Sequence, residues 1–378
     1  MLRGFNIDIS FFKISRKGGN MLKNIKKIAS GTLAVISALS IAVMAIAPAH
    51  ATSNGITIVD GKGWCATLKL PVAPAPGQPH SWQVSTTYCQ PFRWASGPHQ
   101  VDVLTHGATY TNAYWDWHQN PDLYSYVHKT LKDGRATLNY DRIGNGDSTR
   151  PTLSHDITMA SDAYVLHQLI GGMHFIGFEK VNSISHSYGA GVALAEAATY
   201  ADVSKLALTG YLHRLSNPAV TAGNYPANQD PMFAGLGLDD GYLTTRPNVR
   251  GTSFHSPTTD PNLVAYDEKH KDLVSLTGLL DFLGQRGVPA ASNISNKVHV
   301  PVLVMVGQQD AIFCYNPAAF DCSNLATVTA NETPFYTAAS SLKVVTVPGS
   351  GHDVTLDLPF DPTVNDPYAQ INDWINHN

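Results

Sequence analysis

The stretch "VNSISHSYGAGVALAEAA", from Val181 to Ala198, decides how the fold is interpreted. It runs from a short β-branched segment, through small residues, into a segment typical of a helix. It nearly matches G-x-S-x-G, a sharp strand-to-helix turn that lifts a nucleophilic serine above a sheet. Ser187 and Gly189 fit this motif, but Ser185 stands where the first glycine belongs. Because serine is only slightly larger than glycine, we expect the turn to tolerate it.

Segments on both sides of this stretch alternate between predicted strands and helices. Upstream strands are expected in "GWCATLKLPV", "SWQVSTTYC", "HQVDVLTHGATY" and "ATLNYDRIGNGDS", and helices near 123–131 and 159–170. Downstream strands are expected in "VSKLALTG", "VHVPVLVMVGQQD" and "SLKVVTVPGSGHD", followed by a final helix in "AQINDWINHN". This alternation predicts an α/β domain with a mostly parallel sheet over residues 52–378.

The region from about 211 to 296 interrupts this alternation. It is rich in Pro, Gly and Asp, and it contains helical pieces such as "LVSLTGLLDFL" but no regular strand signal. Roughly 85 residues are too many for an ordinary loop. We therefore interpret this region as a cap inserted between two strands of the sheet.

Residues 1–51 have the composition of a leader. "MLKNIKK" supplies positive charge, 34–47 is apolar or small, and Ala49-His50-Ala51 fits a cleavage site. We expect a secretory signal peptide, a secreted mature chain and no further membrane span. An uncleaved anchor is the alternative, although the apolar run is shorter than the roughly 20 residues of a bilayer span. Met21 precedes the basic segment, so translation starts at either Met1 or Met21.

The net charge of the chain without its leader indicates which partners to expect. The leader holds seven of the 25 Lys and Arg and one of the 29 Asp and Glu, which leaves a formal charge of −10. An acidic chain is a poor partner for nucleic acid.

The four cysteines allow three pairings, and proximity favours Cys65–Cys89 and Cys314–Cys322. Neither the cysteines nor the histidines have metal-ligand spacing, so we expect no catalytic metal.

Three residues at predicted strand ends fit nucleophilic catalysis. Ser187 follows one strand, Asp310 ends "PVLVMVGQQD", and His352 lies in "PGSGHD". Taken singly, each residue has a simpler interpretation: Ser187 as a helix N-cap, Asp310 as a turn-forming residue and His352 as a surface histidine. Together they occur in the order Ser, Asp, His, which favours a catalytic triad. The competing carboxylates Asp321 and Asp281 follow no buried strand.

Two neighbours of the predicted triad are expected to take no part in it. His186 precedes Ser187, but adjacent side chains at a tight turn point apart, so His186 should pack against a neighbouring loop. Asp353 follows His352 and should not orient it. Backbone N–H groups of Tyr188 and Ala108, after "VLTHG", are the candidates for an oxyanion hole.

These motifs together resemble the α/β-hydrolase superfamily of serine hydrolases. The resemblance rests on "THGA", "DRIGNGDS", "SHSYG", "VGQQD" and "GSGHD", with "YWDW" and "SYVHKTL" similar to exported microbial esterases. It implies an eight-stranded, doubly wound sheet, a cap inserted after the sixth strand and no cofactor.

A serine at the turn favours acyl transfer to water, and hence hydrolysis of a small-molecule or lipid carboxylic ester. Amide cleavage of the iminopeptidase type and lactone hydrolysis remain open, and a binding protein without catalytic activity is a remote alternative.

The pocket is expected under the cap and beside the loop after "VLTHG", the oxyanion loop, although each of its aromatic residues could equally belong to the core. Its predicted lining is Tyr114, Trp115, Trp117, Met232, Phe233 and Phe254. The Cys314–Cys322 bridge would close a small loop just after Asp310 and hold the acid turn in place.

Overall fold

The computed structural model describes residues 56–214, 217, 222–315, 320–357 and 366–378. The predicted leader lies outside the described residues. Within them, none of the helices combines the length and the hydropathy that a bilayer span requires.

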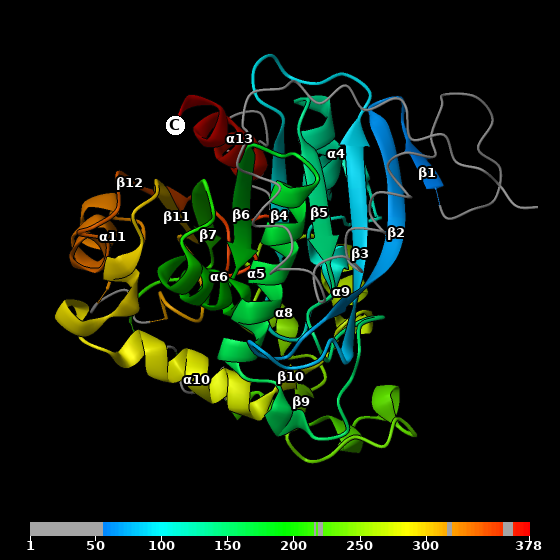
Figure 1. Ribbon diagram of the computed structural model, residues 1–378. Helices are drawn as coiled ribbons and strands as arrows, with labels where there is room; N and C mark the ends of the chain where they lie inside the picture. The colour runs from blue at the N-terminus through cyan, green and yellow to red at the C-terminus, as the bar shows by residue number, and fades with distance from the viewer. Residues whose placement is uncertain (1–55, 215–216, 218–221, 316–319, 358–365) are drawn as a thin grey trace, which may run out of the picture.

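A single mixed sheet forms the centre of the molecule (Figure 1). Its strand order is β1-β2-β3-β5-β4-β6-β7-β11-β12, parallel from β5 to β12 and antiparallel from β1 to β5. The strands are β1 (Ile56–Val59), β2 (Gly63–Val72), β3 (Trp82–Pro91), β4 (Gln100–Thr105), β5 (Ala136–Tyr140), β6 (Lys180–His186), β7 (Lys205–Thr209), β11 (Val302–Gly307) and β12 (Leu342–Val347).

The sheet has nine strands rather than the eight that the resemblance implied. The additional strand is β1, which pairs antiparallel with β2 at the edge, with Thr57 opposite Cys65. Its sequence, ITIV, directly follows the leader and is only four residues long. Such a short apolar segment gives too weak an alternation to be recognised as a strand.

Helices cover both faces of the sheet. On one face α5 (Met159–Phe175) packs against α6 (Tyr188–Tyr200), and on the other α4 (Tyr126–Lys132) contacts α13 (Pro367–His377) (Figure 1). All residues of β5, β7 and β11 are buried. Continuous apolar strands of this kind are expected where helices shield both sides of a parallel sheet.

The segment between β7 and β11 contains the whole range of the predicted insertion. It carries α8 (Arg250–Ser253), α9 (Pro261–Lys269) and α10 (Leu276–Gly287). Although its sequence has no regular strand signal, three short strands form a second, antiparallel sheet there. They are β8 (Asn224–Pro226), β9 (Tyr242–Thr245) and β10 (Val274–Ser275). Strands of two to four residues leave no visible alternation in the sequence.

Both predicted disulfides are present. Cys65 and Cys89 lie directly opposite each other in the β2–β3 pair and are bonded. Cys314 and Cys322 are bonded across the segment that follows β11. No free cysteine remains among the described residues.

Candidate active site

Ser187 occupies the sharp turn between β6 and α6. Its backbone has φ 51° and ψ −117°, a conformation that non-glycine residues rarely adopt. The turn is held because the N–H of Ser187 donates to the Thr209 carbonyl oxygen, at 2.9 Å, from the adjacent strand β7. Ser187 does occupy the N-cap position of α6, as the alternative interpretation had it, but its hydroxyl accepts no hydrogen bond from an N–H of the helix. The strained turn instead presents the hydroxyl above the sheet.

The positions two residues before and two residues after Ser187 differ in how much space a side chain has. A Cβ added to Gly189 would lie 2.5 Å from the carbonyl oxygen of His106, so only glycine fits there. Ser185 is fully buried in β6, and its hydroxyl lies 3.1 Å from that of Ser183. The serine that replaces the first glycine therefore has both space and a hydrogen-bond partner.

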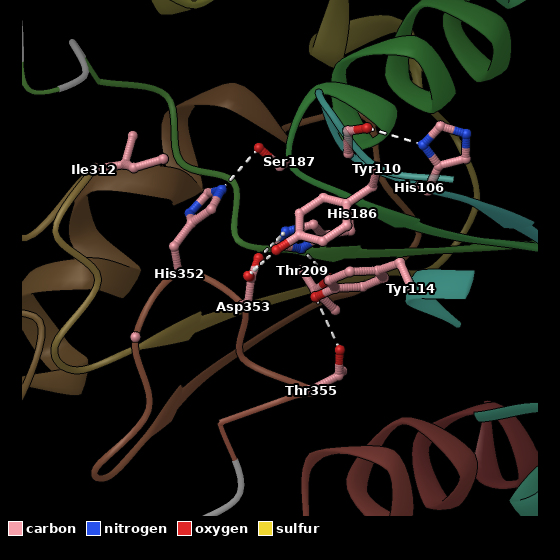
Figure 2. Close-up of polar contacts among 12 residues, drawn as sticks. His106, Tyr110, Tyr114, His186, Ser187, Thr209, Ile312, His352, Asp353 and Thr355 are labelled. Carbon is pink, nitrogen blue, oxygen red and sulfur yellow. Dashed lines mark hydrogen bonds and ion pairs between the residues drawn. The ribbon is translucent and has the colours of Figure 1, made fainter. Parts of the chain in front are cut away.

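His352 and Asp310 converge on Ser187 from the loops that follow β12 and β11. The Ser187 hydroxyl lies 2.8 Å from Nε2 of His352 (Figure 2), and Nδ1 of His352 lies 2.9 Å from Oδ2 of Asp310. The other Asp310 oxygen, Oδ1, accepts from the N–H groups of Ile312 and Phe313, at 2.7 and 3.0 Å. These bonds fix the carboxylate so that it holds the imidazole with Nε2 facing the serine.

The pKa of His352 reflects two opposing effects. Burial disfavours the charged imidazole, but the charge of Asp310 and its hydrogen bond outweigh burial and raise the pKa above the ordinary value. Arg286 acts in the opposite sense, because its positive charge opposes protonation. The site therefore favours a histidine that accepts a proton readily.

Two residues remain the candidates for an oxyanion hole. Ala108, after β4, and Tyr188, at the start of α6, both line the same cavity as Ser187. Within the described residues, neither N–H donates to a protein acceptor. The loop is fixed from behind by the guanidinium of Arg142, which donates to the carbonyl oxygens of His106 and Gly107 at 3.3 and 3.1 Å. Both N–H groups are thus available to an oxyanion.

The cavity above Ser187 has mostly apolar walls. Helix α10 supplies one wall through Leu279, Phe282 and Leu283, and the turn after Asp310 supplies another through Ile312 and Phe313. The buried cation Arg286 also lines it, and its guanidinium lies 4.4 Å from the ring centroid of Phe282.

Of the six residues predicted to line the pocket, the structure brings only Phe254 to this cavity. Trp115 packs against Tyr126, and Trp117 against Tyr266, in the core. Tyr114 is fully buried and stacks on His186, with ring centroids 4.3 Å apart. These three rings are therefore buried in the core and do not line the cavity.

Met232 and Phe233, which the sequence also predicted to line the pocket, lie elsewhere as well. Phe233 is buried within a short 3₁₀ helix of the insertion, and Met232 beside it is 45% exposed. Neither contributes to the cavity that contains Ser187. The residues that do form its wall belong to α10, where Leu279, Phe282, Leu283 and Arg286 share one face at helical spacing. That spacing is visible in the sequence as one face of a helix, but it does not indicate which cavity this face lines.

His186 has a defined structural role beside the candidate triad. Its Nε2 lies 3.1 Å from Oδ1 of Asp353, and its Nδ1 lies 3.1 Å from the hydroxyl of Thr209 (Figure 2). Burial lowers the pKa of His186, although Asp353 partly opposes this effect. As predicted, Asp353 does not contact the ring nitrogens of His352; its side-chain partners are His186, the hydroxyl of Tyr110 and, at 3.6 Å, Nε2 of His255.

Behind Tyr110, a buried network ties the insertion to the sheet. Asp267 of α9 accepts from the guanidinium of Arg250 at 2.7 and 2.9 Å, from His255 at 3.0 Å and from Tyr110 at 3.1 Å. His255 in turn contacts Asp357, after β12, at 2.7 Å. The network compensates each buried charge with an opposite one.

A hydroxyl, an imidazole and a carboxylate that meet at the carboxyl edge of a parallel sheet are typical of hydrolases of this architecture. The chain belongs to the alpha/beta hydrolase family, whose model matches residues 103–366. A comparison with curated proteins found no match.

Several solved structures share the fold at low sequence identity. An esterase from Thermogutta terrifontis is 18% identical, with a TM-score of 0.52, over 82% of this chain and 98% of its own. A monoglyceride lipase variant from Saccharomyces cerevisiae is 15% identical, with a TM-score of 0.56, over 88% and 98%. An enol-lactonase from Burkholderia xenovorans is 17% identical, with a TM-score of 0.50, over 78% and 97%. Such distant likeness supports the fold.

Proposed function

We propose that the protein is a secreted serine hydrolase that cleaves carboxylic esters through an acyl-enzyme on Ser187. The observation that carries this proposal is the chain of contacts from Ser187 to His352 to Asp310, at 2.8 and 2.9 Å, beside a mostly apolar cavity. In a silent binding protein of this fold, nothing would require all three groups in contact.

In the first half-reaction the Ser187 oxygen attacks the ester carbonyl carbon while Nε2 of His352 takes its proton. The N–H groups of Ala108 and Tyr188 stabilise the negative charge that develops on the carbonyl oxygen. The protonated His352 then gives its proton to the leaving alcohol as the C–O bond breaks. Asp310 holds the imidazole and stabilises its positive charge throughout.

In the second half-reaction a water molecule enters the position of the alcohol. His352 takes a proton from this water as its oxygen attacks the acyl carbon, and returns a proton to Ser187 as the acid leaves. All of these steps use groups of this chain, so we propose no cofactor.

The cavity walls support an uncharged, apolar acyl or alcohol group, as in a small-molecule or lipid ester. Helix α10 forms one of these walls, so we propose that the insertion acts as the cap and selects the substrate. Export agrees with the predicted leader and with two disulfides, which persist in oxidising compartments.

A substrate panel tests the reaction class. The mature chain is offered p-nitrophenyl esters of increasing acyl length, aminoacyl anilides and lactones. We expect kcat/KM to be highest for an ester. Faster cleavage of the anilides or lactones would replace the ester proposal with the corresponding alternative on the same three residues.

Covalent labelling tests the nucleophile independently of the substrate. A fluorophosphonate should modify the chain once, on the peptide that contains Ser187, and His352→Ala should slow this labelling strongly. Labelling of another serine at an unchanged rate would contradict the assignment.

A further inference from the structure

A second cluster of ionisable side chains lies at the far end of α6 from Ser187. It comprises His167 of α5, Glu196 of α6 and Asp202, which follows the end of α6. Nδ1 of His167 lies 2.7 Å from Oδ2 of Asp202 and 3.7 Å from Oε1 of Glu196. One nitrogen or oxygen from each residue falls within 4.8 Å of the other two. The cluster thus gathers one imidazole and two carboxylates around a single point.

Glu196 is the unusual member of this cluster. Its side chain has 0% exposure, and within the described residues neither carboxylate oxygen has a hydrogen-bond partner. Oδ1 of Asp202 also lacks one. A buried carboxylate without a hydrogen bond is costly, because burial removes the water that would otherwise solvate it.

We propose that His167, Glu196 and Asp202 form a binding site for a divalent transition-metal ion, with Zn²⁺ as the best fit. An imidazole nitrogen with two carboxylate oxygens is a ligand set that zinc accepts, with a water molecule in the fourth position. Zinc bonds of about 2.0–2.2 Å place tetrahedral ligand atoms roughly 3.4 Å apart, and the observed 2.7 and 3.7 Å bracket this value.

Charge and access also fit a cation. Metal ligation displaces the proton of the imidazole, so a bound ion would leave His167 neutral and the two carboxylates would offset its two positive charges. Asp202 lies just beyond the carboxyl end of α6, where helix carbonyl groups favour positive charge. His167 and Asp202 have side-chain exposures of 32% and 22%, so the ion can reach the site from solvent.

Two other clusters of this kind already contain a cation from the protein. His255, Asp267 and Asp353 lie together, but the guanidinium of Arg250 binds Asp267 at 2.7 Å. Asp60, Asp122 and His128 lie together, and the ammonium of Lys62 binds Asp122. Within the described residues, no Lys or Arg forms an ion pair with the cluster of His167, Glu196 and Asp202.

The site would stabilise the fold rather than take part in the reaction. Glu196 lies nine residues after Ser187, roughly 13 Å away along α6. A bound ion would connect α5 to the end of α6, the helix whose first turn holds Ser187.

Thermal unfolding of the mature chain with and without zinc chloride tests the site, with Glu196→Gln as the decisive variant. Gln keeps the size of the side chain but removes the charged ligand. We expect zinc at about 100 times its Kd to raise the Tm of the unmodified chain by about 5 °C, and EDTA to reverse the rise. Calcium chloride should give a smaller rise, since calcium prefers more oxygen ligands.

Glu179→Gln is the matched control, because Glu179 is an exposed carboxylate outside the cluster. It should keep the full zinc-dependent rise, whereas Glu196→Gln should lose it. Absence of a rise in the unmodified chain, or an equal rise in Glu196→Gln, would overturn the proposal. If Glu196→Gln does not fold, the half-exposed His167→Gln provides the same comparison.

Discussion

Two Asp–His–hydroxyl arrangements lie side by side at the carboxyl edge of the sheet. In one, Asp310, His352 and Ser187 are joined at 2.9 and 2.8 Å; in the other, Asp353, His186 and Thr209 are joined at 3.1 and 3.1 Å. The two imidazole centroids are only 4.9 Å apart. Residue types and distances alone therefore do not separate a reactive site from a structural one.

The difference lies at the hydroxyl end of each arrangement. Ser187 stands on a strained turn and faces the cavity, whereas Thr209 is fully buried at the end of β7 and lies 3.4 Å from the carbonyl oxygen of Ser185. The histidines respond in opposite ways, since the pKa of His352 is raised and that of His186 is lowered. Access of the hydroxyl to substrate, rather than hydrogen bonding, distinguishes the two.

The largest expected effect comes from removing each hydroxyl. Ser187→Ala should lower kcat by about 10⁶-fold and leave the fold intact. Thr209→Val should cost about 1–3 kcal/mol of unfolding free energy, because Nδ1 of His186 loses its partner, with kcat changed less than about tenfold. Ester hydrolysis and thermal unfolding check both variants. Loss of turnover in Thr209→Val matching that in Ser187→Ala would show that both hydroxyls are catalytic.

The two carboxylates give the next contrast. Asp310→Asn should lower kcat by about 10⁴-fold, because the amide no longer holds His352 in the reactive tautomer. Asp353→Asn should instead lower the Tm, since Asp353 contacts His186 and Tyr110 in the buried network. Steady-state kinetics and melting curves on the same preparations compare them. The distinction fails if Asp353→Asn reduces kcat as strongly as Asp310→Asn.

The pH profile separates the two histidines more finely. Catalysis needs neutral His352, so kcat/KM should fall as pH decreases through its pKa, which Asp310 raises above the ordinary value. Arg286→Met removes a positive charge that opposes protonation, so the acidic limb should move to higher pH. The exposed Arg93→Met is the control and should leave the limb in place. A shift to lower pH in Arg286→Met would contradict this electrostatic assignment.

The smallest effect is expected from Ser185→Gly, on the strand that both arrangements share. A glycine in β6 should cost about 0.5–1 kcal/mol of stability and leave kcat nearly unchanged. Gly189→Ala, on the other flank of Ser187, is the contrasting variant, because its Cβ would collide with a backbone oxygen. Activity and Tm should fall clearly in Gly189→Ala. Equal tolerance of both changes would argue against a tightly packed turn.

The sequence was sufficient to predict the fold class and the meeting of Ser187, Asp310 and His352. Each of these residues follows a strongly apolar or β-branched strand, and parallel strands bring their carboxyl ends to one edge. The same reasoning could not place Tyr114, because an aromatic residue after a strand is equally compatible with a cavity wall and with the core. Its direction depends on the backbone turn after the oxyanion loop.

Contacts across the sheet could not be predicted from the sequence, for a different reason. His186 meets Thr209 because they are partners in the register between β6 and β7, and sequence spacing does not specify that register. The cluster around Glu196 likewise joins two helices and a loop without a ligand-spacing motif. In contrast, the stripe of α10 that includes Phe282 was visible as helical spacing, but only the structure identifies which cavity it faces.

The distance along the chain between Ser187 and His352 has a consequence for when reactivity arises. The two residues are 165 positions apart, and His352 depends on β11 and β12, which complete one edge of the sheet. The turn at Ser187 needs only neighbouring segments, whereas its base arrives through contacts that are slow to form because they are distant in sequence. Under the proposed function, the serine is therefore an ordinary alcohol until the sheet is complete, and only the completed sheet makes it a nucleophile.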